Sequence, residues 1–222
     1  MTGSGSFTDD GCPVEVYRLL PSRGEPEFIH GRIPPACSIL DLGAGAGRIA
    51  DPLVAMGHQV IAVDNSPAML AHVQRAETAL ADIVAFRDRR TFPAVILASS
   101  LINSADPGLR RGFLATVAHH LDPDGTAFIQ WFAPDWFDQL QAGTSRRGTI
   151  GPLASVLQVA SVDDGLLDAT VSYELGVQSW SQTFRSRRLT LADVEAELAA
   201  AGLRLLGDER HADGDWLIAA PA

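Results

Sequence analysis

A glycine-rich turn between two apolar segments constrains the fold of this chain more than any other feature. The apolar run Ser38–Leu42 contains Asp41, and glycines occupy alternate positions of the segment 43–47 that follows. Glycine lacks a Cβ and tolerates positive φ, so such a turn lets the backbone approach a ligand closely. A second apolar run, 59–63, ends in Asp64, an acid placed to accept hydrogen bonds from a ribose diol. The pattern is typical of a strand–turn–helix–strand unit that binds an adenosine-bearing cofactor.

The spacing of the glycines separates two classes of cofactor site. A dinucleotide fingerprint, G-x-G-x-x-G, would place its third glycine where this chain has Arg48. Here the third glycine comes one residue earlier, at Gly47, and Asp41 stands two residues before the first glycine. This Asp-x-Gly-x-Gly-x-Gly pattern resembles motif I of the class I S-adenosylmethionine (SAM) dependent methyltransferases. SAM has no pyrophosphate, so its site needs no phosphate cradle at a helix N-terminus.

Strand and helix patterns alternate along most of the chain, which predicts a doubly wound α/β domain with a parallel sheet. Ser66 and Pro67 form a cap with proline at the first helical position, so a helix is expected from there to about residue 76. Beyond the two strands that flank the glycine turn, further strands are expected at 78–81, 94–99 and 126–132.

The resemblance to class I methyltransferases implies how these elements assemble. It implies one seven-stranded Rossmann-like sheet within a domain at 25–222, closed by an antiparallel hairpin of 203–206 with 216–220. Residues 1–24 are expected to form a flexible lead and an N-terminal capping helix.

The segment 149–188 has a different pattern, because apolar and polar residues alternate in it with a period of two. Asp163, Asp164 and Gly165 are a hairpin-turn signal between two such runs. A three-stranded antiparallel insertion is therefore expected here. In small-molecule members of the family such strands build part of the acceptor pocket, and one edge of them could pair two copies into a homodimer.

Composition argues against several classes of protein. The chain has 17 Lys and Arg against 27 Asp and Glu, a net charge of −10, and nucleic-acid affinity depends on neutralising phosphates. No apolar run approaches the roughly 20 residues that span a bilayer, and the N-terminus lacks signal-peptide features. Only Cys12 and Cys37 are present, and the histidines show no metal-ligand spacing. We expect no metal, no nucleic-acid or membrane partner, and a cytoplasmic location.

The resemblance also implies roles for individual residues around SAM. Asp41 and the glycine turn are expected to face the methionine and sugar portions, Asp64 the ribose hydroxyls, and Asp82 the adenine amino group. Ser99 lies at the end of the fourth expected strand and is expected near the sulfonium. The expected cofactor-binding residues are Asp41, Gly43, Ala44, Gly45, Gly47, Asp64, Asn65, Met69, Asp82, Ile83 and Ser99.

The acceptor site is expected beyond the carboxyl ends of the strands, where open α/β sheets bind their ligands. Aromatic rings there can face the acceptor or contact the sulfonium by a cation–π interaction. The substrate-binding candidates are Tyr17, Asn103, Gln130, Trp131, Trp136, Trp180 and Gln182. The candidates for catalysis are Asn103, Trp131 and Asp135, and a general base, where one is needed, could be Asp135, Glu174 or His30.

The resulting hypothesis is SAM-dependent methyl transfer to a small-molecule acceptor, by in-line displacement at the sulfonium methyl. Whether the methyl goes to oxygen, nitrogen, carbon or sulfur stays open. One alternative is an enzyme of the same fold with cyclase- or decarboxylase-like chemistry, and another is a non-catalytic SAM-binding protein. A nicotinamide-dependent dehydrogenase is a more distant alternative.

Overall fold

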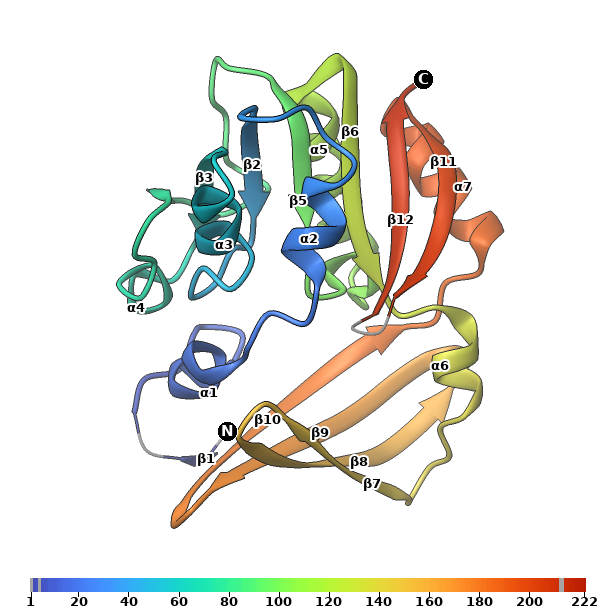
Figure 1. Ribbon diagram of the computed structural model, residues 1–222. Coiled ribbons are helices and arrows are strands. Elements are labelled where there is room, and N and C mark those ends of the chain that lie inside the picture. Colours follow the sequence, from blue (N-terminus) through green and yellow to red (C-terminus); the bar gives the residue numbers. More distant parts are fainter. Residues whose placement is uncertain (1, 4, 212–213) are drawn as a thin grey trace.

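The computed structural model describes residues 2–3, 5–211 and 214–222. It contains two β-sheets, a larger one in the upper part of Figure 1 and a smaller one below it. Helices α1 (Val14–Leu19) and α6 (Pro134–Asp138) lie beside the junction of the two sheets, on opposite sides of the view. The expected flexible lead includes residues 1 and 4, which lie outside the described residues.

The larger sheet is the predicted seven-stranded sheet. Its strands are β2 (Ser38–Leu42), β3 (Gln59–Asp64), β4 (Glu77–Leu80), β5 (Phe92–Leu97), β6 (Leu121–Trp131), β11 (Leu203–His211) and β12 (Gly214–Pro221). Their order is β11-β12-β6-β5-β2-β3-β4. The five strands from β4 to β6 are parallel, whereas β12 is antiparallel to both β6 and β11. The doubly wound fold and its closing hairpin are confirmed.

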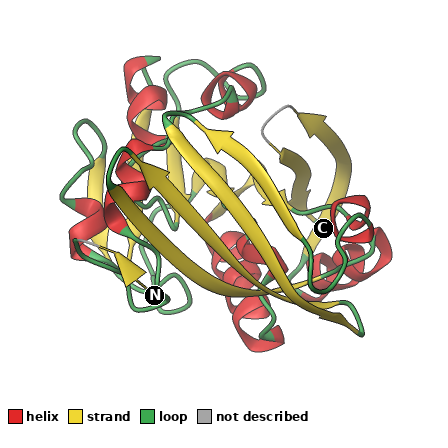
Figure 2. Cartoon of the chain, turned by 90° about the horizontal axis from the view of Figure 1, so that it is seen from below, coloured by secondary structure: helices red, strands yellow, loops and turns green. Residues whose placement is uncertain are grey.

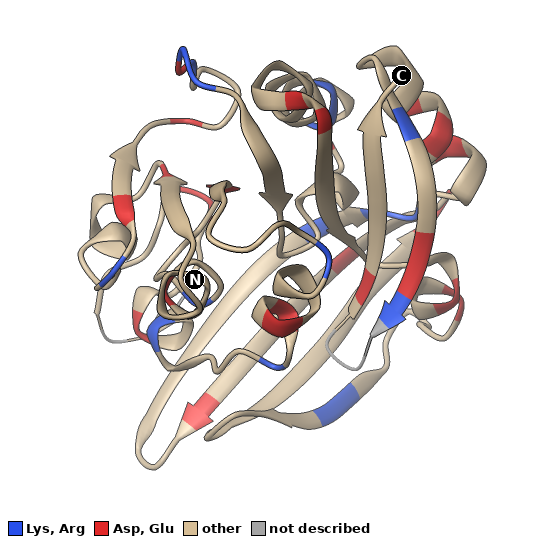
Figure 3. Ribbon diagram, turned by 45° about the horizontal axis from the view of Figure 1, so that its top comes forward, with Lys and Arg blue, Asp and Glu red and all other residues tan. Residues whose placement is uncertain are grey.

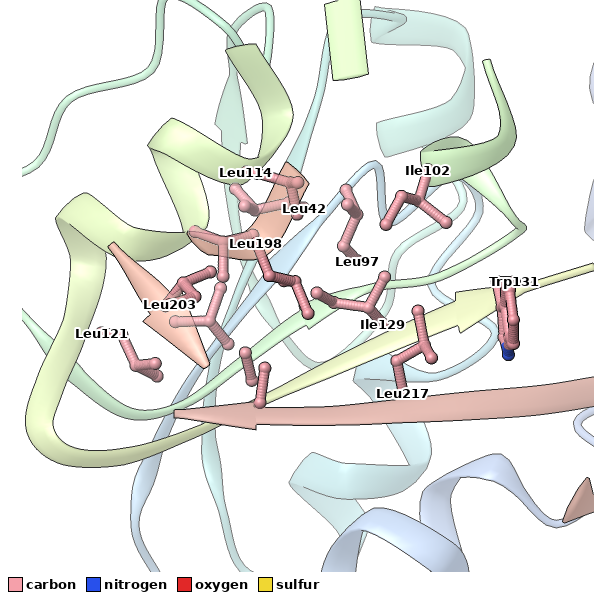
Figure 4. Close-up of a cluster of buried hydrophobic side chains, with 14 of the residues drawn as sticks. Leu42, Leu97, Ile102, Leu114, Leu121, Ile129, Trp131, Leu198, Leu203 and Leu217 are labelled. Carbon is pink, nitrogen blue, oxygen red and sulfur yellow. The ribbon is translucent and has the colours of Figure 1, made fainter. Parts of the chain in front are cut away.

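Helices cover both faces of this sheet and bury its apolar strands. Helices α2 (Glu25–His30) and α3 (Ala50–Ala55) pack on one face, and α5 (Pro107–His120) and α7 (Leu191–Ala200) pack on the other. Figure 4 shows the second of these clusters, in which Leu114 and Leu198 approach the strand residues Leu42 and Leu97. Each such side chain contributes roughly 1.5–3 kcal/mol to stability when fully buried. The burial of these side chains between the helices and the sheet therefore stabilises the layered packing.

The helix after Ser66 is shorter than predicted. Helix α4 (Pro67–Leu70) begins at the expected cap, where the Ser66 hydroxyl accepts a hydrogen bond from the Met69 N–H at 3.2 Å. It ends six residues early because the carboxylate of Asp51, on α3, accepts hydrogen bonds from the backbone N–H groups of residues 74–76 at 2.8–3.1 Å. A side chain distant in sequence thus holds this segment as a turn instead of a helix.

The antiparallel insertion is confirmed and is larger than predicted. The second sheet has the order β1-β10-β9-β8-β7, and its strands are β1 (Thr2–Gly3), β7 (Ser145–Ile150), β8 (Leu153–Asp163), β9 (Leu166–Leu175) and β10 (Gln178–Arg187). β7 was not expected because its sequence, Ser-Arg-Arg-Gly-Thr-Ile, shows no apolar alternation. The homodimer remains a prediction, and β1 and β7 are the two edge strands of this sheet.

Asn103 links the two sheets. It ends the 3₁₀ helix η1 (Leu101–Asn103) after β5 and is 1% exposed. Its side-chain amide donates to the carbonyl oxygens of Phe132 (3.2 Å) and Arg187 (3.0 Å) and accepts from the Phe132 N–H (2.8 Å). Figure 2, seen from below, shows the strands of the second sheet in front of the larger sheet. The end of β5 is therefore tied to both β6 and β10.

Among the described residues, no helix combines the length and the hydrophobicity that crossing a bilayer requires. Acidic and basic residues are interspersed over both sheets and their helices (Figure 3).

Candidate active site

A cavity of about 860 Å³ lies at the carboxyl ends of the parallel strands, between the two sheets. One part of it, here called the cofactor part, is lined by the glycine turn, the residues after β3, β4 and β5, and the N-terminal segment. The other part, here called the acceptor part, is lined by Tyr17 of α1, Phe132, α6, the start of α5 and the strands β7–β10. The two parts are continuous, so a ligand in one can react with a ligand in the other.

The glycine turn leaves its backbone open to the cavity. Gly43 has a φ of +75°, which side chains rarely adopt, and a Cβ there would lie 2.8 Å from Leu101 Cδ1, so a larger residue would require the Leu101 side chain to shift. Gly45 also has a positive φ, +55°, but a Cβ there would meet nothing within 4 Å. The N–H groups of Gly43 and Ala44 donate to the Val63 carbonyl at 2.8 and 3.0 Å, which fixes the turn to β3. Gly45 is therefore the point where a ligand can lie directly against the backbone.

Asp64 is held at the end of β3 by two backbone groups. Its carboxylate accepts hydrogen bonds from the Gly45 N–H at 2.9 Å and the Ser66 N–H at 2.8 Å. Burial raises the pKa of Asp64, and these two hydrogen bonds oppose that rise. Each oxygen keeps further lone pairs toward the cavity, which is the arrangement that a ribose diol requires.

Asp41 is the most unusual charged group of the site. It is 1% exposed, it lines the cavity, and neither of its carboxylate oxygens has a hydrogen-bond partner among the described residues. Burial, with a smaller contribution from the charge of Asp64, raises the pKa of Asp41 to about 7. A buried carboxylate without partners is costly unless a cation or a donor reaches it. The ammonium group of SAM is such a partner, so the residues present fit this cofactor.

The remaining cofactor candidates gather around the same cavity. Met69 is buried, and Asp82 receives a hydrogen bond from the Val84 N–H at 2.7 Å, which makes it a turn residue as well. Ser99, after β5, has a φ of +57°, a strained conformation of the kind found at functional sites. All the expected cofactor residues line the cavity except Gly47, which turns the chain beside Asp51.

Four of the seven substrate candidates line the cavity: Tyr17, Asn103, Trp136 and Gln182. Asn103 is already committed to the backbone groups of Phe132 and Arg187, so its amide positions the second sheet. Trp136 lies on α6 and stacks on Phe132, with ring centroids 4.1 Å apart.

The other three substrate candidates do not line the cavity, since tertiary packing has used them elsewhere. The Gln130 side chain accepts from the Ser99 N–H at 2.8 Å and so supports the end of β5. Trp131 is 2% exposed in the core of the larger sheet, and Trp180 is 2% exposed against Val16 and Leu153.

The base candidates also lie outside the cavity. Asp135 pairs with Arg210 at 2.5 Å, Glu174 is exposed on β9, and His30 contacts His58 with their ring nitrogens 2.9 Å apart. Among the described residues, no cluster of His, Cys, Asp or Glu suits a metal ion.

Sequence reasoning identified Tyr17 but missed the contribution of residues 8–12 to the cavity and most of the residues of its acceptor wall. The additional lining residues include Thr8, Asp10, Cys12, Phe113, Phe132, Arg146, Ser155, Leu157, Val171, Tyr173 and Phe184. The period-two pattern of 166–175 already placed Val171 and Tyr173 on one face of a strand. No short sequence pattern indicated that the face of β9 with Val171 and Tyr173 would line the cavity.

Comparisons with known proteins identify the same segment. Residues 39–125 match the model of a family described as "Methyltransferase domain". This segment runs from β2 to the turn inside β6 and contains the glycine turn, Asp64 and Asp82. A search of curated proteins finds no match.

Solved structures share the fold over nearly the whole chain. The CcbJ methyltransferase from Streptomyces caelestis has a TM-score of 0.75 at 18% identity, covering 91% of each chain. CalS10, an amino pentose methyltransferase from Micromonospora echinaspora solved with SAM bound, has a TM-score of 0.70 at 21% identity, covering 89% of this chain and 88% of its own. The sugar N-methyltransferase KedS8 from Streptoalloteichus has a TM-score of 0.69 at 22% identity, covering 100% and 98%. Residues 39–125 are therefore similar to a methyltransferase domain, and nearly the whole chain has the fold of these SAM-dependent methyltransferases.

Proposed function

We propose that this protein transfers the methyl group of SAM to a small-molecule acceptor bound between the two sheets. The observation that carries the proposal is the shared cavity, because it joins the glycine turn and Asp64 directly to a pocket on the second sheet. Pockets for small ligands are concave and combine apolar surface with placed polar groups. The acceptor part has apolar and aromatic walls together with polar side chains, among them Arg146, Arg147 and Arg185.

In the cofactor part, each proposed role follows from a group already positioned by the fold. Asp64 would accept the ribose hydroxyls while Gly45 and Ser66 hold its carboxylate. Asp41 would pair with the ammonium of the methionine portion, which supplies the partner that its buried oxygens lack. When bound, SAM supplies a methyl group already activated by its positive sulfur.

In the acceptor part, the chain contributes walls and orientation. Phe132, Trp136 and Phe184 offer aromatic surface, and Tyr17 and Gln182 offer polar groups. Holding donor and acceptor in line accounts for much of the rate of a displacement of this type.

The ionisable groups of the acceptor part favour a nucleophile that needs no base. Its lining includes no histidine, aspartate or glutamate among the described residues. Burial raises the pKa of Tyr173 to about 12 and that of Tyr17 well above its ordinary value, so neither hydroxyl is deprotonated near neutral pH. A neutral amine carries its own lone pair and meets this condition. The N-methyltransferase KedS8 and the amino pentose methyltransferase CalS10 support the same choice by their likeness in fold.

Calorimetry with SAM and mass spectrometry of the products test the proposal together. We expect saturable SAM binding by the wild type, at least a hundredfold weaker binding by Asp64→Ala, and unchanged binding by Asp163→Ala, a control at an exposed hairpin turn. An acceptor purified from cell extract should gain one methyl group as SAM is consumed. Absence of SAM binding by the wild type would contradict the proposal. Consumption of SAM without a methylated product would favour the cyclase- or decarboxylase-like alternative.

A further inference from the structure

The N-terminal segment before α1 forms a compact turn over the cavity. In this turn, here called the N-terminal turn (residues 6–14), the Val14 N–H donates to the Ser6 carbonyl at 3.0 Å and the Thr8 N–H donates to the Cys12 carbonyl at 3.0 Å. The Cys12 N–H donates to the Thr8 hydroxyl at 2.8 Å. These bonds hold the tip, with Asp9 and Asp10, in a defined conformation.

The N-terminal turn contacts both parts of the cavity. Cys12 and Val14 pack against Ala46 of the glycine turn and against Met69 of α4. On its other side, the Cys12 Sγ lies 3.3 Å from the Tyr17 hydroxyl and accepts from the Gln182 Nε2 on β10 at 3.0 Å. The turn therefore sits at the border between the cofactor part and the acceptor part.

Asp10 carries a negative charge at this border. It lines the cavity, its Oδ1 accepts a hydrogen bond from the Thr8 hydroxyl, and its Oδ2 lies 3.6 Å from the Cys12 Sγ. The charge of Asp10 affects two neighbouring groups. Burial raises the pKa of Cys12 to about 11, and it also raises the pKa of Asp64 on the opposite side of the cavity; the negative charge of Asp10 adds to both increases. None of the arginines in the described chain forms an ion pair with Asp10, and the sequence has no lysine.

The cofactor part as a whole is built for a cation. Four carboxylates line it, from Asp10, Asp41, Asp64 and Asp82. Its arginine, Arg48, is paired with the buried carboxylate of Glu25. The carboxylate of Asp41, buried and without a described partner, is an independent sign that a positive group belongs here.

We propose that Asp10 recognises the sulfonium of SAM and makes this site prefer SAM to its demethylated product, S-adenosylhomocysteine (SAH). This inference rests on the proposed function, because it assumes that SAM fills the cofactor part. The sulfonium lies between the ribose and the methionine portion, and its methyl must point toward the acceptor. Asp10, Cys12 and Asp64 line the same cavity, so a cofactor whose ribose binds Asp64 would have its positive sulfur near the border where Asp10 and Cys12 lie. SAH has a neutral sulfur, so the charge of Asp10 favours the substrate over the product.

Calorimetric titration of SAM and of SAH into Asp10→Asn and Asp9→Asn tests this inference. Asn keeps the shape and the oxygen that Thr8 contacts, and Asp9 is a matched exposed acid that does not line the cavity. We expect Asp10→Asn to weaken SAM binding about tenfold and SAH binding less than about twofold, the size expected for one partly solvated charge pair. Asp9→Asn should change neither dissociation constant. Asp10→Glu keeps the charge and should keep the preference for SAM, and thermal melting checks that each variant is folded.

The outcomes separate this inference from the proposed function. If the wild type binds SAM and Asp10→Asn weakens SAM and SAH equally, Asp10 contacts a group that both share and the sulfonium assignment is wrong. If Asp10→Asn behaves like Asp9→Asn, Asp10 has no role in cofactor recognition. If the wild type binds neither ligand, the proposed function itself fails.

Discussion

At the scale of single residues, the buried carboxylate of Asp41 lowers the stability of the ligand-free protein. Its carboxylate lies in the interior without a described partner, and burial raises its pKa from 3.8 to about 7. The folded chain therefore binds a proton that the unfolded chain has already lost between about pH 4 and about pH 7, so this group lowers the stability of the ligand-free protein as pH rises through that window. Such a cost is typical of groups kept for function.

The pH dependence of SAM binding tests this account of Asp41. Because only the ionised carboxylate attracts the ammonium of SAM, affinity should rise about tenfold between about pH 6 and about pH 8. Asp41→Asn should bind SAM weakly at every pH, and its ligand-free melting temperature should fall less than that of the wild type over the same range. Calorimetry and thermal melts measure the two effects. A wild-type affinity that does not change with pH would contradict the pKa assigned to Asp41.

At the scale of elements, two glycines allow the effect of backbone conformation to be distinguished from the effect of ligand access. Gly45 and Gly57 both have positive φ, +55° and +97°, and a Cβ at either position would meet no atom within 4 Å. Only Gly45 lines the cavity. The same substitution at the two positions therefore carries a similar backbone cost, about 1 kcal/mol.

We expect Gly45→Ala to fold with a small loss of stability and to lose most of its SAM affinity, because the added methyl group occupies ligand space. Gly57→Ala should lose a similar amount of stability and bind SAM like the wild type. Chemical denaturation measures the first quantity and calorimetry the second. Equal SAM affinity in the two variants would show that the cofactor does not approach Gly45.

At the scale of the whole molecule, the cavity exists because the second sheet is fixed against the end of the larger one. Asn103 supplies three hydrogen bonds at this junction. A second connection is the Ser186 hydroxyl, which donates to the Asn103 carbonyl at 3.3 Å. Removing the Asn103 amide would leave backbone groups of Phe132, directly after β6, and of Arg187 in β10 without this partner.

Asn103→Ala should therefore lower the free energy of unfolding by about 2–4 kcal/mol. Hydrogen exchange should increase at Phe132 and in β10, while SAM binding should weaken much less than in Asp64→Ala. Ser104→Ala, a neighbouring substitution that removes one long hydrogen bond at 3.3 Å, is the control and should cost less than about 1 kcal/mol. Stability like that of the control would mean that Asn103 does not hold the sheets together.

Features set by neighbouring residues could be predicted from this sequence, whereas features set by contacts between distant residues could not. The glycine turn, Asp41 and Asp64 are close in sequence and are positioned by one strand–turn–helix–strand unit, so a local pattern contains the whole arrangement. The end of the helix after Ser66 was predicted wrongly because the carboxylate of Asp51, about twenty residues away, binds its backbone. Gln130, Trp131 and Trp180 were chosen by residue type and strand position, and packing directed all three away from the cavity.

By itself, the sequence determined the parallel sheet, the spacing that matches a SAM-binding turn and the existence of an antiparallel insertion. These follow from short-range periodicity and from the backbone freedom of glycine. Only the tertiary structure decided which face of the insertion meets the cofactor part, that β7 and β1 extend it, and that the N-terminal turn places Asp10 at the border. Those features depend on contacts between residues distant along the chain, such as Cys12 with Gln182 and Asn103 with Arg187. Such contacts form only when the whole chain folds, so short sequence patterns do not reveal them.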